Sequence, residues 1–214
     1  MTRILLVRHG QSAWNASGRW QGWADPPLTE LGRQQAWAAA AAIGTVGAVV
    51  ASDLERAIST ALVISEAIGV GPVVIEPGLK ERDVGEWTGH TRAEIAERWP
   101  DVFAAFLAGG TDRRGAEDSP VVPPGGEQLG VVLERVTAAL RRIADLVEPD
   151  AEAVAITHGG VVRSLERHLG REPEPFPNLG ALWVEVGEAG KPLLGERVLL
   201  IDPAEVAVTI PRQL

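Results

Sequence analysis

The stretch LLVRHG, residues 5–10, and the stretch VAITHGG, residues 154–160, decide how this chain of 214 residues folds. Each begins as an apolar run, which predicts a buried strand, and each reaches a histidine followed by glycine. Ligands bind at the carboxyl ends of the strands in an open parallel sheet, so His9 and His158 are expected at one edge of one sheet. The repeated pattern therefore indicates an active site between two strand ends.

Strand-like and helical runs alternate along the chain, which predicts a three-layer α/β/α sandwich with a mostly parallel central sheet. Strands are expected near 3–8, 48–51, 73–75, 153–157, 182–186 and 197–201. Helices are expected over 29–43, 54–68 and 127–147, after a capping box at Thr91 and Glu94, and after Gly160. We therefore expect one domain, 1–214, with a lid inserted at roughly 78–126, where 108–126 has no periodic pattern.

The charge balance excludes several kinds of partner. The 20 basic and 29 acidic side chains give a net charge of −9, which argues against nucleic acid and anionic membranes but leaves room for a locally basic site. The chain has no cysteine, no spacing typical of a metal site, no signal peptide and no apolar run of the ~20 residues that span a membrane. We expect a cytoplasmic protein without metal or cofactor. The oligomeric state stays open, with a homodimer as one alternative.

Arginine and histidine recur where strands end and helices begin. The imidazole of His9 could attack phosphorus while Arg8 binds phosphoryl oxygens in a fork, although a structural histidine beside a surface arginine gives the same pattern. Arg56 falls in the first turn of a helix and His158 leads directly into another. Free backbone N–H groups favour anions at both places, so the four side chains together suggest a phosphate site.

Two further segments could complete such a site. The loop after the first strand offers Asn15, Gln21 and Gly22 as hydrogen-bonding groups, and its residues Trp14, Trp20 and Trp23 could form pocket walls or pack in the core. Hydrolysis of a phosphate ester needs a proton donor for the leaving oxygen. The carboxyl groups near Trp87 can supply it, and Glu81 and Asp83 are the alternatives that the residues leave open, beside a merely solvated loop.

Six blocks resemble the histidine phosphatase superfamily, in its phosphoglycerate-mutase-like branch. They are residues 6–15, 21–32, 52–61, 79–89, 124–127 and 157–160, in the order in which that family has them. The resemblance implies that His9 is the nucleophile and becomes a phosphohistidine. It implies that Arg8, Arg56 and a protonated His158 surround the phosphoryl group, and that Glu81 is the proton donor. It also implies binding roles for Asn15, Gln21, Gly22, Arg82 and Gly159.

The same family contains phosphatases and mutases, and the sequence favours a phosphatase for a small phosphorylated metabolite. Asp83-Val84 stand where the mutases carry His-Tyr, and the following Gly-x-Trp-x-Gly-x-Thr is similar to the phosphatase members. A 2,3-bisphosphoglycerate-dependent phosphoglycerate mutase is the alternative, because Arg92 and Arg113-Arg114 could hold a second anionic group. A phosphoglycerate or sugar-phosphate derivative would satisfy both sets of clues. An inactive ligand-binding member of the fold is the least favoured reading.

Overall fold

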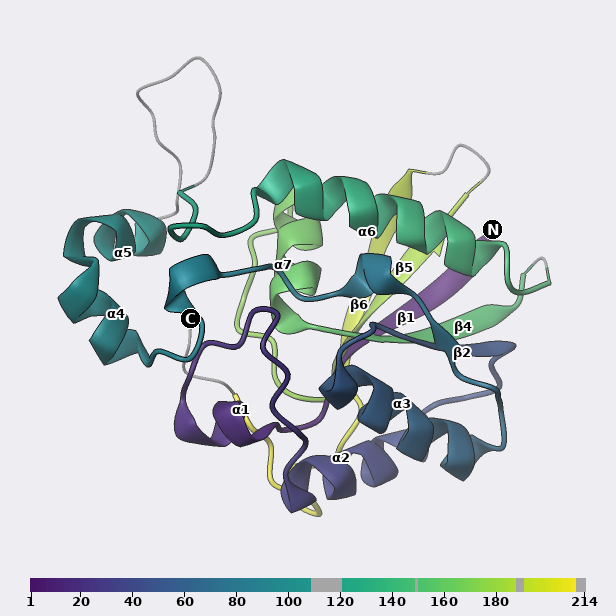
Figure 1. The fold of residues 1–214 in the computed structure, drawn as a ribbon. Coiled ribbons are helices and arrows are strands. Elements are labelled where there is room, and N and C mark those ends of the chain that lie inside the picture. Colours follow the sequence, from purple (N-terminus) through teal and green to yellow (C-terminus); the bar gives the residue numbers. More distant parts are fainter. Residues whose placement is uncertain (109–120, 149, 188–190, 211–214) are drawn as a thin grey trace.

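The computed structural model describes residues 1–108, 121–148, 150–187 and 191–210, and it has a central sheet between two layers of helices (Figure 1). The strand order is β3-β2-β4-β1-β5-β6. Parallel pairing joins the first four strands, whereas β5 runs antiparallel to both β1 and β6. The strands are β1 (Thr2–Arg8), β2 (Ala48–Ala51), β3 (Val74–Ile75), β4 (Glu152–Thr157), β5 (Gly180–Val186) and β6 (Pro192–Leu199). The expected α/β/α architecture with a mostly parallel sheet is confirmed.

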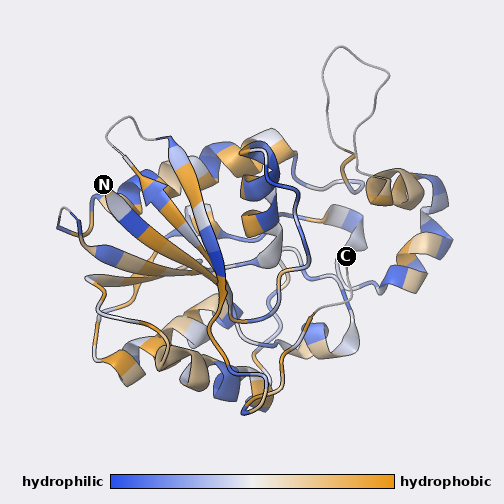
Figure 2. Ribbon diagram, turned by 180° about the vertical axis from the view of Figure 1, so that it is seen from behind, coloured by the Kyte–Doolittle hydropathy of each residue, from blue (hydrophilic) through white to orange (hydrophobic). Residues whose placement is uncertain are grey.

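Each face of the sheet packs against its own helices because side chains alternate along β1. Ile4 and Leu6 belong to the core under α6 (Leu129–Ala144) and α7 (Gly159–His168). Leu5 and Val7 belong to the core over α2 (Glu30–Ala40) and α3 (Glu55–Ile68). Figure 2 shows hydrophobic and hydrophilic residues mixed along both strands and helices, as expected for elements with one face in a core.

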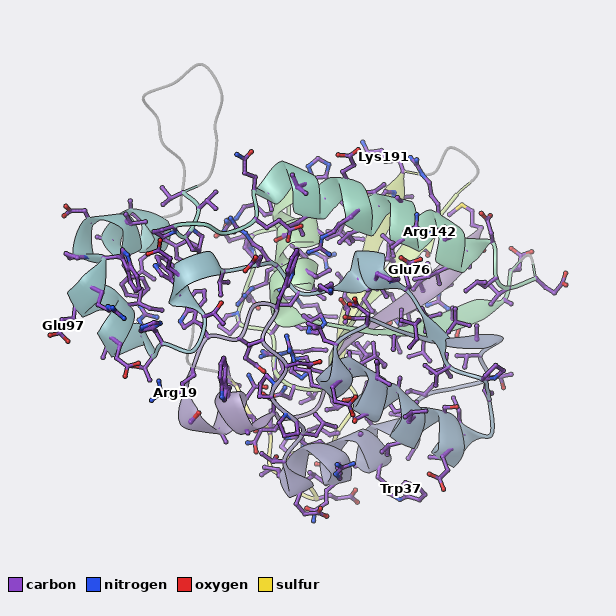
Figure 3. All side chains as sticks on the ribbon, viewed as in Figure 1. Arg19, Trp37, Glu76, Glu97, Arg142 and Lys191 are labelled. Carbon is purple, nitrogen blue, oxygen red and sulfur yellow. The ribbon has the colours of Figure 1, made fainter. Side chains whose placement is uncertain are left out.

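The helix starts follow the sequence closely. Thr29 caps α2 by accepting a hydrogen bond from the Gly32 N–H, and Thr91 and Glu94 form the expected capping box of α4 (Arg92–Arg98). The alanine-rich face of α2 lies on the core, while Trp37 points outward from the same helix and is 60% exposed (Figure 3).

Some of the predicted helix and strand boundaries were wrong. The helix expected over 127–147 is shorter, because Glu127 instead accepts from Arg135 (2.8 Å) and its N–H donates to Asp83 O (3.0 Å). The last strand begins earlier, at Pro192, which an edge strand tolerates because it leaves one side unpaired. The short helices α1 (Ala13–Ser17) and α5 (Pro100–Leu107) were not expected.

The segment between β3 and α6 packs on a third apolar cluster, the lid cluster, which contains Trp20, Val84, Trp87, Ile95 and Phe103. Its described elements are the 3₁₀ turns η1 (Pro77–Leu79) and η2 (Gly85–Trp87) with α4 and α5. In Figure 1, α4 and α5 lie to one side of the sheet rather than over it. The inserted-lid assignment stays a prediction, and residues 109–120 fall outside the described part of the chain.

Arg142 on α6 ties this helix to the end of β3 through Glu76. The guanidinium Nε lies 2.8 Å from the Glu76 carboxylate, and the two labelled side chains approach each other in Figure 3. That hydrogen-bonded pair lowers the pKa of Glu76.

Within the described residues, no helix is long and apolar enough to cross a bilayer.

Gly32 allows the loop after β1 to pack against α2. A Cβ at this position would overlap Gln11 O and lie 2.9 Å from Gln11 N. Gln11 cannot simply retreat, because its backbone N–H donates to Gln35 Oε1 (2.9 Å) and its carbonyl accepts from Thr29 N (2.9 Å). The close approach fixes the loop that follows His9.

We expect Gly32→Ala to lower the free energy of unfolding by about 1–3 kcal/mol, the usual cost of overpacking, although alanine favours helices over glycine. Thermal and denaturant unfolding measure this effect. Gly44→Ala is the matched control, because a Cβ there would meet no heavy atom within 4 Å. Equal stabilities of the two variants would contradict this account.

Candidate active site

His9 follows β1 and is fixed in one tautomer. Its backbone N–H donates to Thr157 O (3.0 Å), and its ring Nδ1 lies 2.7 Å from Gly10 O. A carbonyl can only accept, so Nδ1 carries the proton. Arg56 Nε, which can only donate, lies 3.3 Å from His9 Nε2. Nε2 therefore holds a lone pair, and this is the ring atom available as a nucleophile.

His158 is the N-cap residue of α7 and lies beside His9. The two ring centroids are 5.2 Å apart, and both side chains are buried. His158 Nε2 is 2.8 Å from Ser52 Oγ, which orients the ring. Nδ1 of His158 is buried without a hydrogen-bond partner among the described residues. The predicted meeting of the two histidines at one sheet edge is therefore found in the structure.

Two buried arginines accompany the histidines. Arg56 donates to Ala24 O (2.7 Å) and Gly22 O (2.9 Å), so the loop after β1 holds its guanidinium. Arg8 donates to Phe176 O, while its Nε is buried without a partner in the described part of the chain. Burial lowers the pKa of Arg8 to about 9 and that of Arg56 to about 10, so both remain cationic at neutral pH.

Both imidazoles are neutral in this arrangement. Burial lowers the pKa of His9 well below its ordinary value of 6.5, and the charges of Arg56 and Arg8 lower it further. Burial and the charge of Arg56 likewise lower the pKa of His158, and His9 and Arg8 lower it further. The expectation of a protonated His158 concerned a site that holds a phosphoryl group, and it stays a prediction; in the free protein burial and the neighbouring arginines keep this imidazole neutral.

Glu81 is one of two carboxyl groups that line the cavity beside this cluster, the other being Glu174. The two carboxylate oxygens of Glu81 accept from the backbone N–H groups of Arg82 (2.8 Å) and Gly160 (3.2 Å). Trp23 Nε1 donates to the Glu81 carbonyl (2.7 Å) and holds the backbone. The alternative, Asp83, does not line the cavity and accepts from Gly85 N (2.9 Å). Geometry thus favours Glu81 over Asp83.

The cavity has a volume of about 360 Å³ and lies between the β1 loop, the lid segment and α7. Polar groups line one part of it and the side chains of Trp20, Phe106 and Leu107 line another. Its charged and polar lining consists of Arg8, Gln21, Glu81, Arg82, Arg163, Ser164, Arg167 and Glu174, together with Gly22, Gly159 and Gly160. The buried Arg56 reaches this lining through its hydrogen bond to Gly22 O.

The binding residues expected from the sequence fall into two groups. Gln21, Gly22, Arg82 and Gly159 line the cavity. Asn15 does not; it is buried, its Oδ1 accepts from Asn178 (3.3 Å), and its Nδ2 has no partner among the described residues.

The tryptophans near the site also fall into different groups, some packed in the lid cluster and some at the cavity or the surface. Trp87 is wholly in the lid cluster, and Trp20 both packs in that cluster and lines the cavity. Trp23 is 48% exposed and holds Glu81.

Sequence reasoning missed two side chains that position the histidines. Ser52 orients His158, and its place directly after a predicted strand was a usable signal. Asn178 donates to His9 O (2.7 Å), but it lies in a stretch without any motif.

Of the three arginines suggested for a second anion, the structure describes only Arg92. Arg92 is exposed, stacks on Phe103 and does not line the cavity. Arg113 and Arg114 lie outside the described residues. Arg163 and Arg167 on α7, which drew no attention in the sequence, line the cavity instead. Among the described residues, no group of three or more His, Asp or Glu side chains could hold a metal ion.

Comparison with known proteins identifies the family. Residues 4–183 match the model of the Histidine phosphatase superfamily (branch 1), and the chain belongs to that superfamily. It is 38% identical to the metal-independent phosphoserine phosphatase of Arabidopsis thaliana over 168 residues, which cover 77% of this chain and 67% of that protein.

Mycobacterial relatives match over more of their length. The chain is 35% identical to glucosyl-3-phosphoglycerate phosphatase of Mycobacterium tuberculosis over 196 residues, covering 84% of this chain and 81% of that protein. A solved structure of the mycobacterial glucosyl-3-phosphoglycerate phosphatase with VO3 superimposes with a TM-score of 0.76 at 30% identity, covering 94% and 99% of the two chains.

The depressed histidine pKa values make stability depend on pH. Below about pH 6.5 the imidazoles of the unfolded chain bind protons that His9 and His158 in the native state do not, so protonation favours unfolding. We expect the free energy of unfolding to fall as pH decreases from 7.5 to 5.5, by at most ~1.4 kcal/mol per pH unit for each histidine.

Denaturant unfolding at a series of pH values measures this slope. In His158→Asn the slope should be shallower, because one of the two contributions is gone. A wild-type stability that stays flat over this range, or a slope that His158→Asn leaves unchanged, would show that the two imidazoles are not held neutral.

Proposed function

We propose that this protein is a phosphomonoesterase that works without a metal ion through a phosphohistidine at His9, on a small phosphorylated metabolite. The observation that carries the proposal is the fixed tautomer of His9, whose Nε2 lone pair faces a site with two buried guanidinium groups. A neutral imidazole beside fixed positive charge is what in-line attack on a phosphoryl group needs.

In the first step His9 Nε2 forms a bond to phosphorus while the bond from phosphorus to the ester oxygen breaks. Arg8 and Arg56 stabilise the charge on the phosphoryl oxygens. His158 Nδ1, which has no partner among the described residues, can bind these oxygens as well. Glu81 gives its proton to the departing oxygen, so the leaving group departs as an alcohol.

In the second step a water molecule attacks the phosphohistidine. Glu81, now a carboxylate, takes a proton from the water molecule. At the same time the oxygen of the water bonds to phosphorus, and the bond between phosphorus and His9 Nε2 breaks. Inorganic phosphate leaves, and His9 returns to its neutral Nδ1–H form. The Gly10 carbonyl accepts from Nδ1–H throughout, which stabilises the positive charge of the ring while it carries the phosphoryl group.

The names of the relatives support phosphatase activity for this protein and favour one class of substrate. Phosphoserine and glucosyl-3-phosphoglycerate are both phosphoesters that carry a carboxylate, and we propose a metabolite of this class, a phosphoglycerate or a sugar-phosphate derivative of one. A relative named phosphoglycerate mutase-like protein 4, 37% identical over 165 residues, favours the mutase alternative.

We expect His9→Ala to lower the rate of phosphate release by about a thousandfold or more, the scale on which loss of a nucleophile acts. The assay uses a panel of phosphate esters without added metal, including 3-phosphoglycerate with and without 2,3-bisphosphoglycerate. Acid quenching alone would destroy a phosphohistidine, so labelled enzyme is trapped in alkali. Wild-type enzyme should retain label and His9→Ala should not.

His168→Ala is the matched control, because this histidine is exposed at the end of α7 and should leave the rate unchanged. Isomerisation of 3-phosphoglycerate to 2-phosphoglycerate without phosphate release would instead establish the mutase. Undiminished phosphate release by His9→Ala would exclude the proposed nucleophile.

Gly160 leaves room for the Glu81 carboxylate. A Cβ at Gly160 would overlap Glu81 Oε1 and lie 3.1 Å from Cδ, so the flexible carboxylate would have to move. We expect Gly160→Ala to reduce kcat about tenfold to a hundredfold, part of what general acid catalysis contributes. The melting temperature should stay the same or rise, because alanine favours the helix.

Gly130→Ala in α6 is the control, since a Cβ there would meet no heavy atom within 4 Å. It should leave kcat unchanged. If Gly160→Ala kept full kcat, the position of Glu81 beside α7 would not matter for proton transfer.

A further inference from the structure

The cavity beside His9 carries more positive charge than the proposed chemistry uses. Four arginines line it, Arg8, Arg82, Arg163 and Arg167, against the two carboxylates of Glu81 and Glu174. The whole chain has a net charge of −9, so this concentration of guanidinium groups is local. Arg8 belongs to the phosphoryl site, and the other three arginines take no part in the two steps proposed above.

Arg163 and Arg167 come from one face of α7. Residues four apart on a helix lie next to each other, so the two side chains enter the cavity as a pair. Arg163 is half-buried and Arg167 is exposed at the rim. Burial lowers the pKa of Arg163 to about 10, and it therefore keeps its charge at neutral pH.

The carboxylates near this pair are engaged elsewhere. Glu166 is fully buried and accepts from Arg197 Nε (2.6 Å), with Arg171 Nη1 3.7 Å away. Glu174 pairs with the same Arg197 at 3.8 Å, and Glu81 accepts from backbone N–H groups.

The charges of Glu81 and Glu166 raise the pKa of Arg163, but neither carboxylate pairs directly with its guanidinium. Across the described ranges, this guanidinium makes no hydrogen bond or ion pair with any side chain.

Arg82 lines the same cavity and has one donor without a partner among the described residues. Its Nε donates to Glu127 O (2.9 Å), which fixes the guanidinium plane. Its Nη2 is buried and has no partner among the described residues. A buried guanidinium nitrogen without an acceptor is costly, and an anionic ligand in the cavity would satisfy it.

We propose, on the basis of the phosphatase function above, that Arg163 together with Arg82 and Arg167 binds a carboxylate that belongs to the leaving group of the substrate. The Gly160 N–H holds Glu81, which meets the ester oxygen, and Arg163 lies three residues further along α7, ~4.5 Å along the helix axis. A carboxylate three bonds from the ester oxygen, as in a three-carbon phosphorylated acid, spans that step. The apolar side chains of Trp20, Phe106 and Leu107, which line the rest of the cavity, would contact any further group on the substrate.

Matched substrates with and without the carboxylate test this subsite. Phosphoserine is compared with phosphoethanolamine, and 3-phosphoglycerate with glycerol 3-phosphate, for wild type and Arg163→Gln. Wild type should prefer the carboxylate member of each pair in kcat/KM. Arg163→Gln should reduce that preference by about tenfold to a hundredfold, mainly through KM, because a charge-assisted contact is lost. Arg163→Lys should keep part of the preference.

Arg33→Gln removes the same charge from an exposed position on α2, and it should leave every rate unchanged. If Arg163→Gln does not fold, Arg167→Gln at the exposed rim replaces it, with a smaller loss of preference expected. The subsite proposal fails if wild type hydrolyses both members of a pair equally well, or if the variant slows both members by the same factor.

Failure of the phosphatase proposal would look different. In that case wild type would release no phosphate from any ester, p-nitrophenyl phosphate included. Calorimetric binding of phosphoserine and phosphoethanolamine to wild type would then still test the carboxylate subsite. Equal affinity for the two would overturn it.

Discussion

The site depends on the parallel pairing of β1 with β4. In this register Arg8 stands opposite Thr157, and the His9 N–H donates to the Thr157 carbonyl (3.0 Å). Two strands far apart in sequence therefore end at the same level, and the residue after each strand is a histidine. A one-residue slip would send every side chain to the opposite face and separate the two imidazoles. Both apolar cores hold the register, because Ile4 and Leu6 lie in one core and Leu5 and Val7 lie in the other.

Backbone carbonyl groups accept hydrogen bonds from the reactive side chains and thereby orient them. Gly10 O selects the tautomer of His9, while Gly22 O and Ala24 O hold Arg56. Such acceptors carry no net charge, so they orient guanidinium and imidazole groups without neutralising them. Asp25, whose Oδ1 lies 3.6 Å from Arg56 Nη1, offsets part of the charge of Arg56. Burial, followed by the charges of the arginines, holds both histidines in their neutral form.

The sequence predicted the elements and residues whose signals are local. The strand at 48–51, the Thr91 capping box and the strand-end histidines were all found as expected. What the sequence could not give depends on tertiary packing. Arg163 resembles any helix arginine until the cavity is seen, and the tautomer of His9 follows from contacts with Gly10 and Arg56. The edge strand β6 was displaced because Pro192 and Gly195 mask its pattern.

Trp20 belongs to two parts of the molecule at once. It lies in the loop that follows His9, yet its ring packs edge-on against Trp87 (5.3 Å) and Phe106 (5.7 Å) of the lid segment. The loop and the segment that contains α4 and α5 therefore share one apolar core. A chimera that received α4 and α5 from a relative would need the matching β1 loop as well, because Trp20 from that loop fills part of the core beneath those helices and also lines the cavity.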